Sequence, residues 1–422
     1  NLVPDPQARW VVTPPLRLAQ AANQDFEVFL SDLEDEFGRA VGSRAVESDR
    51  ERVVILDFFT TRASRVEILD ELAELEQLVT SAGGEVLKVF WQRRDQPDPS
   101  TLVGRGKVEE IALTAQDLGA NLVVCGRELT PSQGRNLEQS LGVRVIDRTQ
   151  LILDIFARRA RSHEGKLQVE LAQLEYLLPR LGGRGEALSR LGGGIGTRGP
   201  GETKLETDRR VIRRRIAKLQ EEVNALQAHR ARLRARRQSR EVPVFALVGY
   251  TNAGKSTLLN ALTDADAYVA NQLFATLDPT TRRLTLPTGE TVLLTDTVGF
   301  VHDLPPQLIN AFRATLEEVT DADALVHVVD LSNPAWLAHI QAVQRILEGL
   351  PVATGPQLLV FNKADLVSPE VRQFAEQEYP LALFVSAHKR WGFLNLRQVL
   401  TRWVHQFRDV PDELAHLHPE ND

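Results

Sequence analysis

Between residues 50 and 150, short apolar runs alternate with longer stretches in which apolar residues recur at helical spacing. Short apolar runs bounded by polar residues are typical of buried strands, and apolar positions about three to four apart are typical of helices. The pattern predicts strands at 51–59, 85–90, 121–125 and 143–146 and helices at 66–82, 107–118 and 131–141. Strands that alternate with helices in this way favour an α/β fold, with a small parallel sheet covered by helices.

A second pattern begins near residue 160, where apolar residues repeat at alternating spacings of four and three. The first set is Leu167, Leu171, Leu174, Leu178 and Leu181, and the second is Ile212, Ile216, Leu219, Val223, Leu226 and Leu233. This repeat predicts a hairpin of two helices with coiled-coil-like contacts. The segment 182–201 between them is rich in glycine and includes Gly194, Gly196 and Gly199 at dinucleotide-fingerprint spacing. We reject that fingerprint because no strand is expected before it and Pro200-Gly201 should spoil the start of a helix.

The most specific motif lies between a predicted strand at 242–248 and a predicted helix that opens at 257–262. It consists of Gly249, Tyr250, Thr251, Asn252, Ala253, Gly254, Lys255 and Ser256, followed by Thr257. These residues match the pattern G-x-x-x-x-G-K-[ST], whose glycines let backbone N–H groups approach a phosphate chain. Lys255 would reach the outer phosphates, and the Ser256 hydroxyl would ligate Mg²⁺ at a helix N-terminus. The motif therefore predicts a P-loop.

Three further motifs follow in the order found in guanine-nucleotide switches, each after an apolar run. The first is Asp296, Thr297, Val298 and Gly299, the second is Asn362, Lys363 and Asp365, and the third is Ser386, Ala387 and His388. Asp296 could hold Mg²⁺ through water, and the Gly299 amide could sense the γ-phosphate. Asp365 could accept hydrogen bonds from the ring N–H and exocyclic amine of guanine. The four motifs together predict a GTP-binding domain with GTP and Mg²⁺ as its ligands.

Side-chain chemistry alone does not identify the switch and catalytic residues uniquely. Thr276, Thr280 and Thr281 each offer a hydroxyl that a metal-binding switch segment needs, and the chemistry does not choose among them. Phe300 occupies the position after Gly299 where many small GTPases carry a Gln that orients water. We therefore expect slow intrinsic hydrolysis that a partner, an ion or a rearrangement accelerates. Asn252 could help to hold K⁺ near the phosphates, or could simply stabilise the loop.

Composition adds a marked segregation of charge. The 422 residues carry a net charge of −7, with 43% hydrophobic and 25% charged residues and one cysteine, Cys125. Residues 154–240 contain 21 Lys and Arg against 10 Asp and Glu, a net of +11 that leaves −18 for the remainder. A basic segment of this kind favours a polyanion, and nucleic acid first of all. No apolar run is long enough for a membrane helix, no signal peptide is evident and a single cysteine allows no intramolecular disulfide, so we expect a cytoplasmic protein. We also expect a monomer.

These patterns divide the chain into five parts. We expect an N-terminal extension at 1–48 with one short helix, an α/β subdomain at 49–153, a basic helical hairpin at 154–240, a GTP-binding domain at 241–408 and an acidic tail at 409–422. The Gly-rich loop at 182–201 would project from the tip of the hairpin. Arg184, Arg190 and Arg198 in that loop are candidates for contacts with a phosphate surface.

The P-loop, the segment Phe274-Ala275-Thr276-Leu277-Asp278 and the segment 296–305 closely resemble the HflX family of ribosome-associated GTPases, as do residues 147–156 and 199–204. The resemblance implies that Thr276 is the switch threonine and a Mg²⁺ ligand. It also implies binding to the large ribosomal subunit and GTP-dependent splitting of stalled or idle ribosomes, with the Gly-rich loop touching ribosomal RNA. Two alternatives stay open: an ATP-linked RNA-remodelling factor, weakly supported by Gly104-Arg-Gly-Lys107, and an accessory GTPase for tRNA modification. The short acidic tail departs from relatives with a longer C-terminal extension.

Overall fold

The computed structural model describes residues 2–3, 11–12, 50–181, 200–238, 242–263, 273–274, 276–302, 313–350 and 355–408. The short helix expected in 1–48, the loop arginines Arg184, Arg190 and Arg198, residue Ala275 and the tail at 409–422 lie outside these ranges. Near the N-terminus, β1 (Leu2–Val3) and β2 (Val11–Val12) pair antiparallel, which the sequence pattern did not predict. No helix in the described part of the chain is long and apolar enough to cross a membrane.

The first α/β unit contains a four-stranded parallel sheet in the order β4-β3-β5-β6. Its elements are β3 (Arg52–Phe59), α3 (Arg65–Ser81), β4 (Glu85–Arg93), α4 (Arg105–Leu118), β5 (Leu122–Cys125), α5 (Pro131–Leu141) and β6 (Arg144–Asp147). Alternate residues of β3 are buried in two different apolar clusters, so both faces of the sheet are covered. Capping boxes begin α3 at Ser64 and α5 at Thr130. The predicted α/β fold is confirmed.

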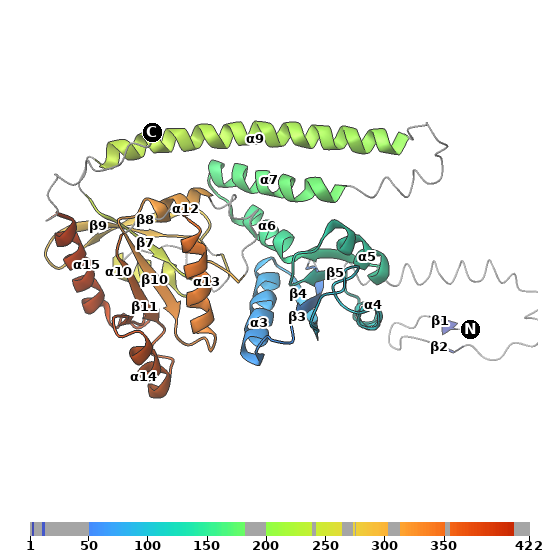
Figure 1. Cartoon of the computed structure of the whole chain (residues 1–422), viewed down its shortest axis with the longest axis horizontal. Coiled ribbons are helices and arrows are strands. Elements are labelled where there is room, and N and C mark those ends of the chain that lie inside the picture. The colour runs from blue at the N-terminus through green and yellow to red at the C-terminus, as the bar shows by residue number, and fades with distance from the viewer. Residues whose placement is uncertain are drawn as a thin grey trace, which may run out of the picture.

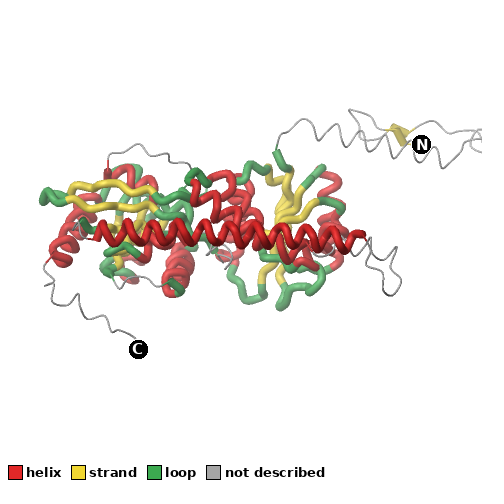
Figure 2. Tube along the Cα trace, turned by 90° about the horizontal axis from the view of Figure 1, so that it is seen from above, coloured by secondary structure: helices red, strands yellow, loops and turns green. Residues whose placement is uncertain are grey.

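Helix α6 (Arg148–Arg159) leads from this sheet to a pair of helices, α7 (His163–Leu177) and α9 (Pro200–Gln238), with the 3-10 turn η1 (Leu178–Leu181) after α7. Leu167 and Leu171 pack against Leu219 and Val223, as the repeat predicted. Its 39 residues make α9 about 58 Å long, and it extends alongside both α/β units (Figures 1 and 2).

One expectation about this hairpin was wrong, because α9 begins at Pro200. Proline is tolerated at the first position of a helix, where its missing N–H has no partner to lose. The dinucleotide fingerprint is still rejected, since η1 and not a strand lies on the N-terminal side of the Gly-rich loop.

The second α/β unit has a six-stranded sheet in the order β12-β11-β10-β7-β9-β8, with only β8 antiparallel to its neighbour. Its strands are β7 (Val244–Val248), β8 (Thr280–Thr285), β9 (Thr291–Asp296), β10 (Ala324–Asp330), β11 (Gln357–Asn362) and β12 (Leu383–Phe384). Its described helices are α10 (Lys255–Thr263), α12 (Arg313–Thr320), α13 (Trp336–Glu348), α14 (Pro369–Glu378) and α15 (Phe393–Arg408). The sequence pattern had not assigned β8, β10 or the last four of these helices.

The two α/β units share one buried apolar cluster rather than meeting only at their surfaces. Ile55 and Phe156 of the first unit belong to the same cluster as Phe274, Phe300 and Val343 of the second. The rings of Phe156 and Phe274 meet edge to face, with their centroids 4.8 Å apart. Movement of one unit against the other would therefore expose apolar surface, which water opposes.

Candidate nucleotide-binding site

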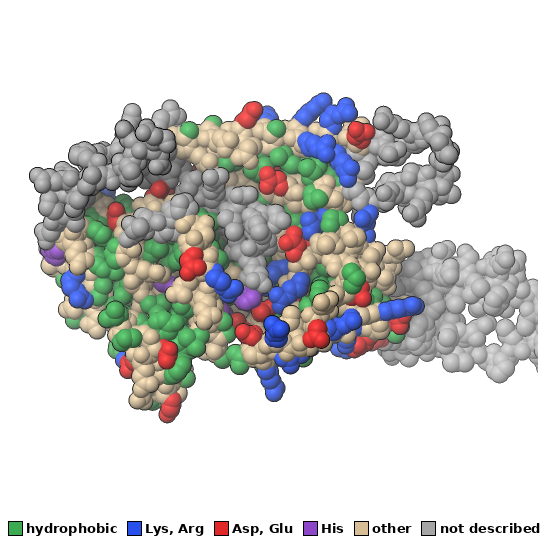
Figure 3. All heavy atoms as spheres, viewed as in Figure 1, with side chains coloured by type: hydrophobic (Ala, Val, Ile, Leu, Met, Phe, Trp, Pro, Cys, Tyr) green, Lys and Arg blue, Asp and Glu red, His purple; other side chains and the backbone are tan. Residues whose placement is uncertain are grey.

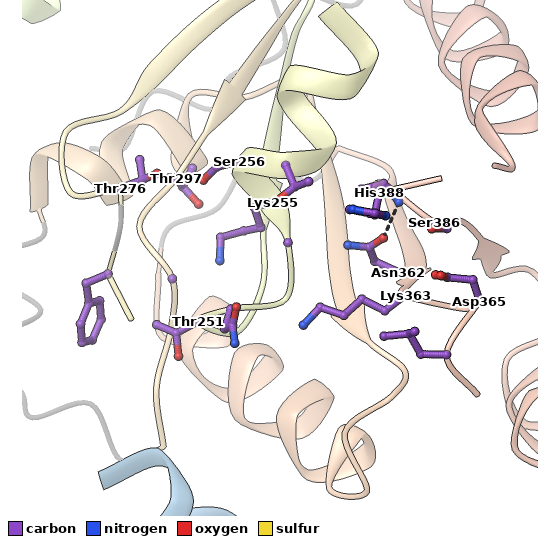
Figure 4. A pocket seen from close by; sticks show the side chains of 17 residues that line it. Thr251, Lys255, Ser256, Thr276, Thr297, Asn362, Lys363, Asp365, Ser386 and His388 are labelled. Carbon is purple, nitrogen blue, oxygen red and sulfur yellow. Dashed lines mark hydrogen bonds between the residues drawn. The ribbon is translucent and has the colours of Figure 1, made fainter. Parts of the chain in front are cut away.

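A cavity of about 470 Å³ opens where β7, β9 and β11 end. Carboxyl ends of parallel strands are the usual binding edge of such a sheet. The residues that line it are Thr251, Asn252, Gly254, Lys255, Ser256, Thr257, Phe274, Thr276, Thr297, Gly299, Asn362, Lys363, Asp365, Leu366, Ser386, Ala387 and His388. The structure thus brings parts of all four motifs and the switch segment to one cavity (Figure 4).

The P-loop is shaped by two glycines that have no room for a side chain. A Cβ on Gly249 would lie 2.1 Å from the Val328 carbonyl oxygen, and one on Gly254 would lie 2.3 Å from Nδ2 of Asn362. Gly254 also has a φ of 90°, which favours glycine. The buried Nζ of Lys255 donates to the carbonyl oxygens of Gly249 and Tyr250 at 2.9 and 2.8 Å. Burial lowers the pKa of Lys255 to about 8, against the opposing effect of Asp296, so it remains mainly a cation at pH 7.

Three side-chain oxygens converge at the end of β9. Oδ2 of Asp296 accepts hydrogen bonds from Oγ of Ser256 at 2.6 Å and from Oγ1 of Thr276 at 2.8 Å, and the two hydroxyls are 2.9 Å apart. Oδ1 of Asp296 is buried and has no hydrogen-bond partner among the described residues. Burial raises the pKa of Asp296, although Lys255 and both hydroxyls act against that rise. Hard oxygen ligands with one carboxylate suit Mg²⁺.

The three candidate switch threonines occupy different places. Thr276 lies at the convergence just described, whereas Thr280 and Thr281 belong to β8. Oγ1 of Thr281 is 3.0 Å from Oγ1 of Thr295 on the neighbouring strand. Of the three, only Thr276 lines the cavity.

At the other end of the cavity, the side chain of Asn362, the last residue of β11, joins the P-loop to the segment that follows β12. Its Nδ2 donates to the Ala253 carbonyl oxygen at 2.9 Å. Its Oδ1 accepts from the Ala387 amide, also at 2.9 Å (Figure 4). Asp365 lies 3.2 Å from Nζ of Lys389. A hydrogen bond from Ser386, followed by one from Lys389, lowers the pKa of Asp365. Asp365 is thus a carboxylate in the lining of the cavity that can accept hydrogen bonds.

Several residues predicted for the site lie outside the cavity lining. Six of these residues are buried next to the cavity without lining it: Gly249, Tyr250, Ala253, Leu277, Asp296 and Val298. Asp278 is directed elsewhere, because its carboxylate accepts hydrogen bonds from the backbone N–H groups of Arg161 and Ser162. Leu366 lines the cavity and was not predicted; its only sequence signal is that it follows Asp365 directly.

The P-loop also contacts the first α/β unit through Tyr250. Its hydroxyl donates to Glu74 of α3, and Glu74 forms an ion pair with Arg148 of α6. The Tyr250 ring stacks on His339 with centroids 3.7 Å apart, and Nε2 of His339 is 2.8 Å from Oδ2 of Asp70. Burial and the nearby Glu74 carboxylate raise the pKa of Tyr250 well above its usual value. The sequence contains no local signal for this contact.

Three family descriptions match consecutive parts of the chain: GTP-binding GTPase N-terminal (69–157), GTP-binding GTPase Middle Region (159–237) and 50S ribosome-binding GTPase (244–363). GTPase HflX of Caldanaerobacter subterraneus subsp. tengcongensis is 49% identical over 362 residues, which cover 86% of this chain and 82% of that protein. GTPase HflX of Escherichia coli is 47% identical over 355 residues, covering 83% and 82%. Among solved structures, a GTP-binding protein from Sulfolobus solfataricus in complex with GDP is 25% identical with a TM-score of 0.43, covering 84% of this chain and 99% of that chain.

Proposed function

Because the chain belongs to the HflX family of GTPases and is a GTP-hydrolysing enzyme, we propose that it binds the large ribosomal subunit and splits or rescues stalled or idle ribosomes. The family description over 244–363, a 50S ribosome-binding GTPase, supports the large subunit as partner. GTP binding would favour one conformation of the protein by a few kcal/mol, enough to act as a release timer.

The observation that carries the ribosome part of the proposal is the basic face of α9. Arg210, Arg213 and Arg214 are exposed and, at spacings of three and four, share one side of the helix. The apolar contact with α7 uses other positions, including Leu219. Lysine and arginine side chains gather at this end of the hairpin (Figure 3). A cluster of cations on the exposed side of this long helix suits the phosphates of ribosomal RNA.

Within the site, Ser256 and Thr276 would hold Mg²⁺ directly and Asp296 through water. The metal would neutralise charge on the phosphate oxygens, while Lys255 and the Gly299 amide contact the outer phosphates. Asp365 would accept hydrogen bonds from the N–H groups of guanine. The convergence of the three oxygens at 2.6–2.9 Å supports the metal assignment.

Intrinsic hydrolysis would be slow because Phe300 is buried in the apolar cluster between the α/β units and offers no polar group to water. Asn252 lines the cavity with a φ of 60°, a conformation that asparagine tolerates. We propose that its amide oxygen helps to hold K⁺ beside the phosphates. Unchanged turnover when Na⁺ replaces K⁺, or in Asn252→Ala, would contradict this role.

The deciding experiment measures GTP turnover by the full chain with and without purified large ribosomal subunits in K⁺ buffer. We expect strong stimulation that is lost when Arg210, Arg213 and Arg214 are all changed to Glu. A control with the same charge change at exposed positions away from α9 should keep the stimulation: Arg135→Glu, Arg345→Glu and Arg402→Glu. No stimulation of the parent chain despite tight GTP binding would refute the ribosome as its partner.

The Gly-rich loop is tested in the same assay. Charge reversal at Arg184, Arg190 and Arg198 should reduce stimulation if the loop contacts ribosomal RNA. Normal stimulation in that variant would leave α9 as the only proposed contact with RNA.

A further inference from the structure

The switch segment is attached to the junction between α6 and α7. Oδ2 of Asp278 accepts hydrogen bonds from the backbone N–H groups of Arg161 and Ser162 at 2.9 and 3.0 Å, and Oδ1 accepts one from the Ser162 hydroxyl. The same hydroxyl accepts from the Gly165 N–H at 2.9 Å and caps α7. The carboxylate thus lies at the positive end of a helix dipole, which favours a negative charge there.

The other end of the same segment is also held by the first α/β unit. The backbone N–H of Leu273 donates to Oγ of Ser81 at 3.1 Å. The ring of Phe274 meets that of Phe156 on α6. Thr276 therefore lies between two anchored points, and its hydroxyl faces Ser256 and Asp296.

Gly165 shows how closely the segment approaches α7. It is the third residue of that helix, where glycine is ordinarily less favourable than alanine. A Cβ at this position would lie only 2.8 Å from Oδ1 of Asp278 and 3.0 Å from Oγ of Ser162. Backbone and hydroxyl donors hold both oxygens of the Asp278 carboxylate in this place, so a Cβ at residue 165 would fit only if the carboxylate moved away from these donors.

We infer that Asp278 is a positioning residue of the GTPase site: it fastens the switch segment to the start of α7 and so holds the Thr276 hydroxyl at the metal position. Because α7 packs along α9, the same contact links the nucleotide to the basic hairpin. Energetic coupling between two sites is reciprocal, so a polyanion that shifts α7 would also change the affinity for the nucleotide. The inference rests on the proposed role of Thr276 as a Mg²⁺ ligand.

The test measures the affinity of the full chain for a non-hydrolysable GTP analogue and, separately, for GDP, both in the presence of Mg²⁺. Thr276 should matter mainly when a γ-phosphate is present. Asp278→Ala should lower the affinity for the GTP analogue by about tenfold, because hydrogen bonds to a charged group are stronger than those between neutral groups. The affinity for GDP should change little. Ser162→Ala should have a smaller effect, and the double variant should resemble Asp278→Ala because both remove one interaction.

A second variant moves the carboxylate without deleting it. Gly165→Ala should reduce the preference for the GTP analogue over GDP, since its Cβ displaces Asp278. Gly134→Ala in α5 is the matched control, because a Cβ there would meet nothing within 4 Å. Hydrogen exchange supplies an independent readout: the analogue should protect the amides of Arg161 and Ser162 in the parent chain and not in Asp278→Ala.

The outcomes separate the inference from the proposed function. If Thr276→Ala lowers the preference for the GTP analogue while Asp278→Ala and Gly165→Ala leave it intact, the inference is overturned and the metal role of Thr276 stands. If Thr276→Ala has no effect, both are overturned. Equal protection of the Arg161 and Ser162 amides in the parent and in Asp278→Ala would also overturn the inference.

Discussion

Replacement of Glu74 by Ala tests whether the buried ion pair below the P-loop stabilises the contact between the two α/β units. Glu74 and Arg148 are each only 6% exposed, and Glu74 also accepts the hydrogen bond from the Tyr250 hydroxyl. In Glu74→Ala, the Arg148 guanidinium and the Tyr250 hydroxyl would both stay buried without this acceptor. Nε of Arg148 already has no partner among the described residues.

The expected loss of unfolding free energy follows from these contacts. Breaking a buried ion pair from one side costs about 3–5 kcal/mol, and an orphaned buried hydroxyl adds about 1–3 kcal/mol. We therefore expect Glu74→Ala to lose at least about 4 kcal/mol, a large part of the roughly 5–15 kcal/mol typical of a domain. Tyr250→Phe should lose only about 1 kcal/mol, because Glu74 keeps Arg148.

The assay is urea unfolding of the full chain, followed by circular dichroism and tryptophan fluorescence. Glu76→Ala, at an exposed position of the same helix, should change stability by less than about 0.5 kcal/mol. The double change Glu74→Leu with Arg148→Met should be milder than Glu74→Ala alone, since it leaves no unpaired charge. If Glu74→Ala lowers the unfolding free energy by less than about 1 kcal/mol, the assumption that the charged Arg148 side chain cannot reach water is refuted.

Four further predictions concern titration, base recognition and the P-loop. Burial raises the pKa of Asp57 to about 6, so between pH 3.8 and 6 the folded state holds a proton that the unfolded state releases. Up to about 3 kcal/mol of stability present below pH 3.8 should therefore be lost as pH rises through 6. Asp57→Asn should abolish this pH dependence of the unfolding free energy across the same range. Burial lowers the pKa of His327 to about 3, so stability should fall as pH drops from 6.5 towards 3; an unchanged acid slope in unfolding of His327→Leu would contradict this. Asp365→Asn should lower the affinity for GTP by at least about 100-fold and favour xanthine nucleotides, which offer a carbonyl where guanine has an amine. If a binding titration gives the same GTP affinity for the variant and the parent, Asp365 does not recognise the base. Gly254→Ala should abolish binding of a fluorescent GTP analogue because its Cβ meets the Asn362 side chain, and normal binding would show that the loop can rearrange.

The residues that line the cavity were largely predictable because the motifs that contain them are contiguous. Each motif places its functional residues within a few positions of one another, at the end of an apolar run that proved to be a strand. Local pattern therefore predicted strands, the P-loop and the fold class without knowledge of tertiary contacts. The start of α9 was misjudged because proline is unfavourable inside a helix but acceptable at its first position.

The amino-acid sequence by itself determined the GTPase family, the α/β architecture and the packing of the helical hairpin, since all three depend on short-range periodicity and motif spacing. The family resemblance had already implied Thr276 among the three threonines, and the tertiary structure puts its hydroxyl against Asp296. Only the tertiary structure decided that Asp278 turns away from the cavity to Ser162, 116 residues earlier. The contact of Tyr250 with Glu74 spans 176 residues. Such pairs arise where the two α/β units pack together, and that packing depends on the three-dimensional shape of both units, which no local pattern encodes.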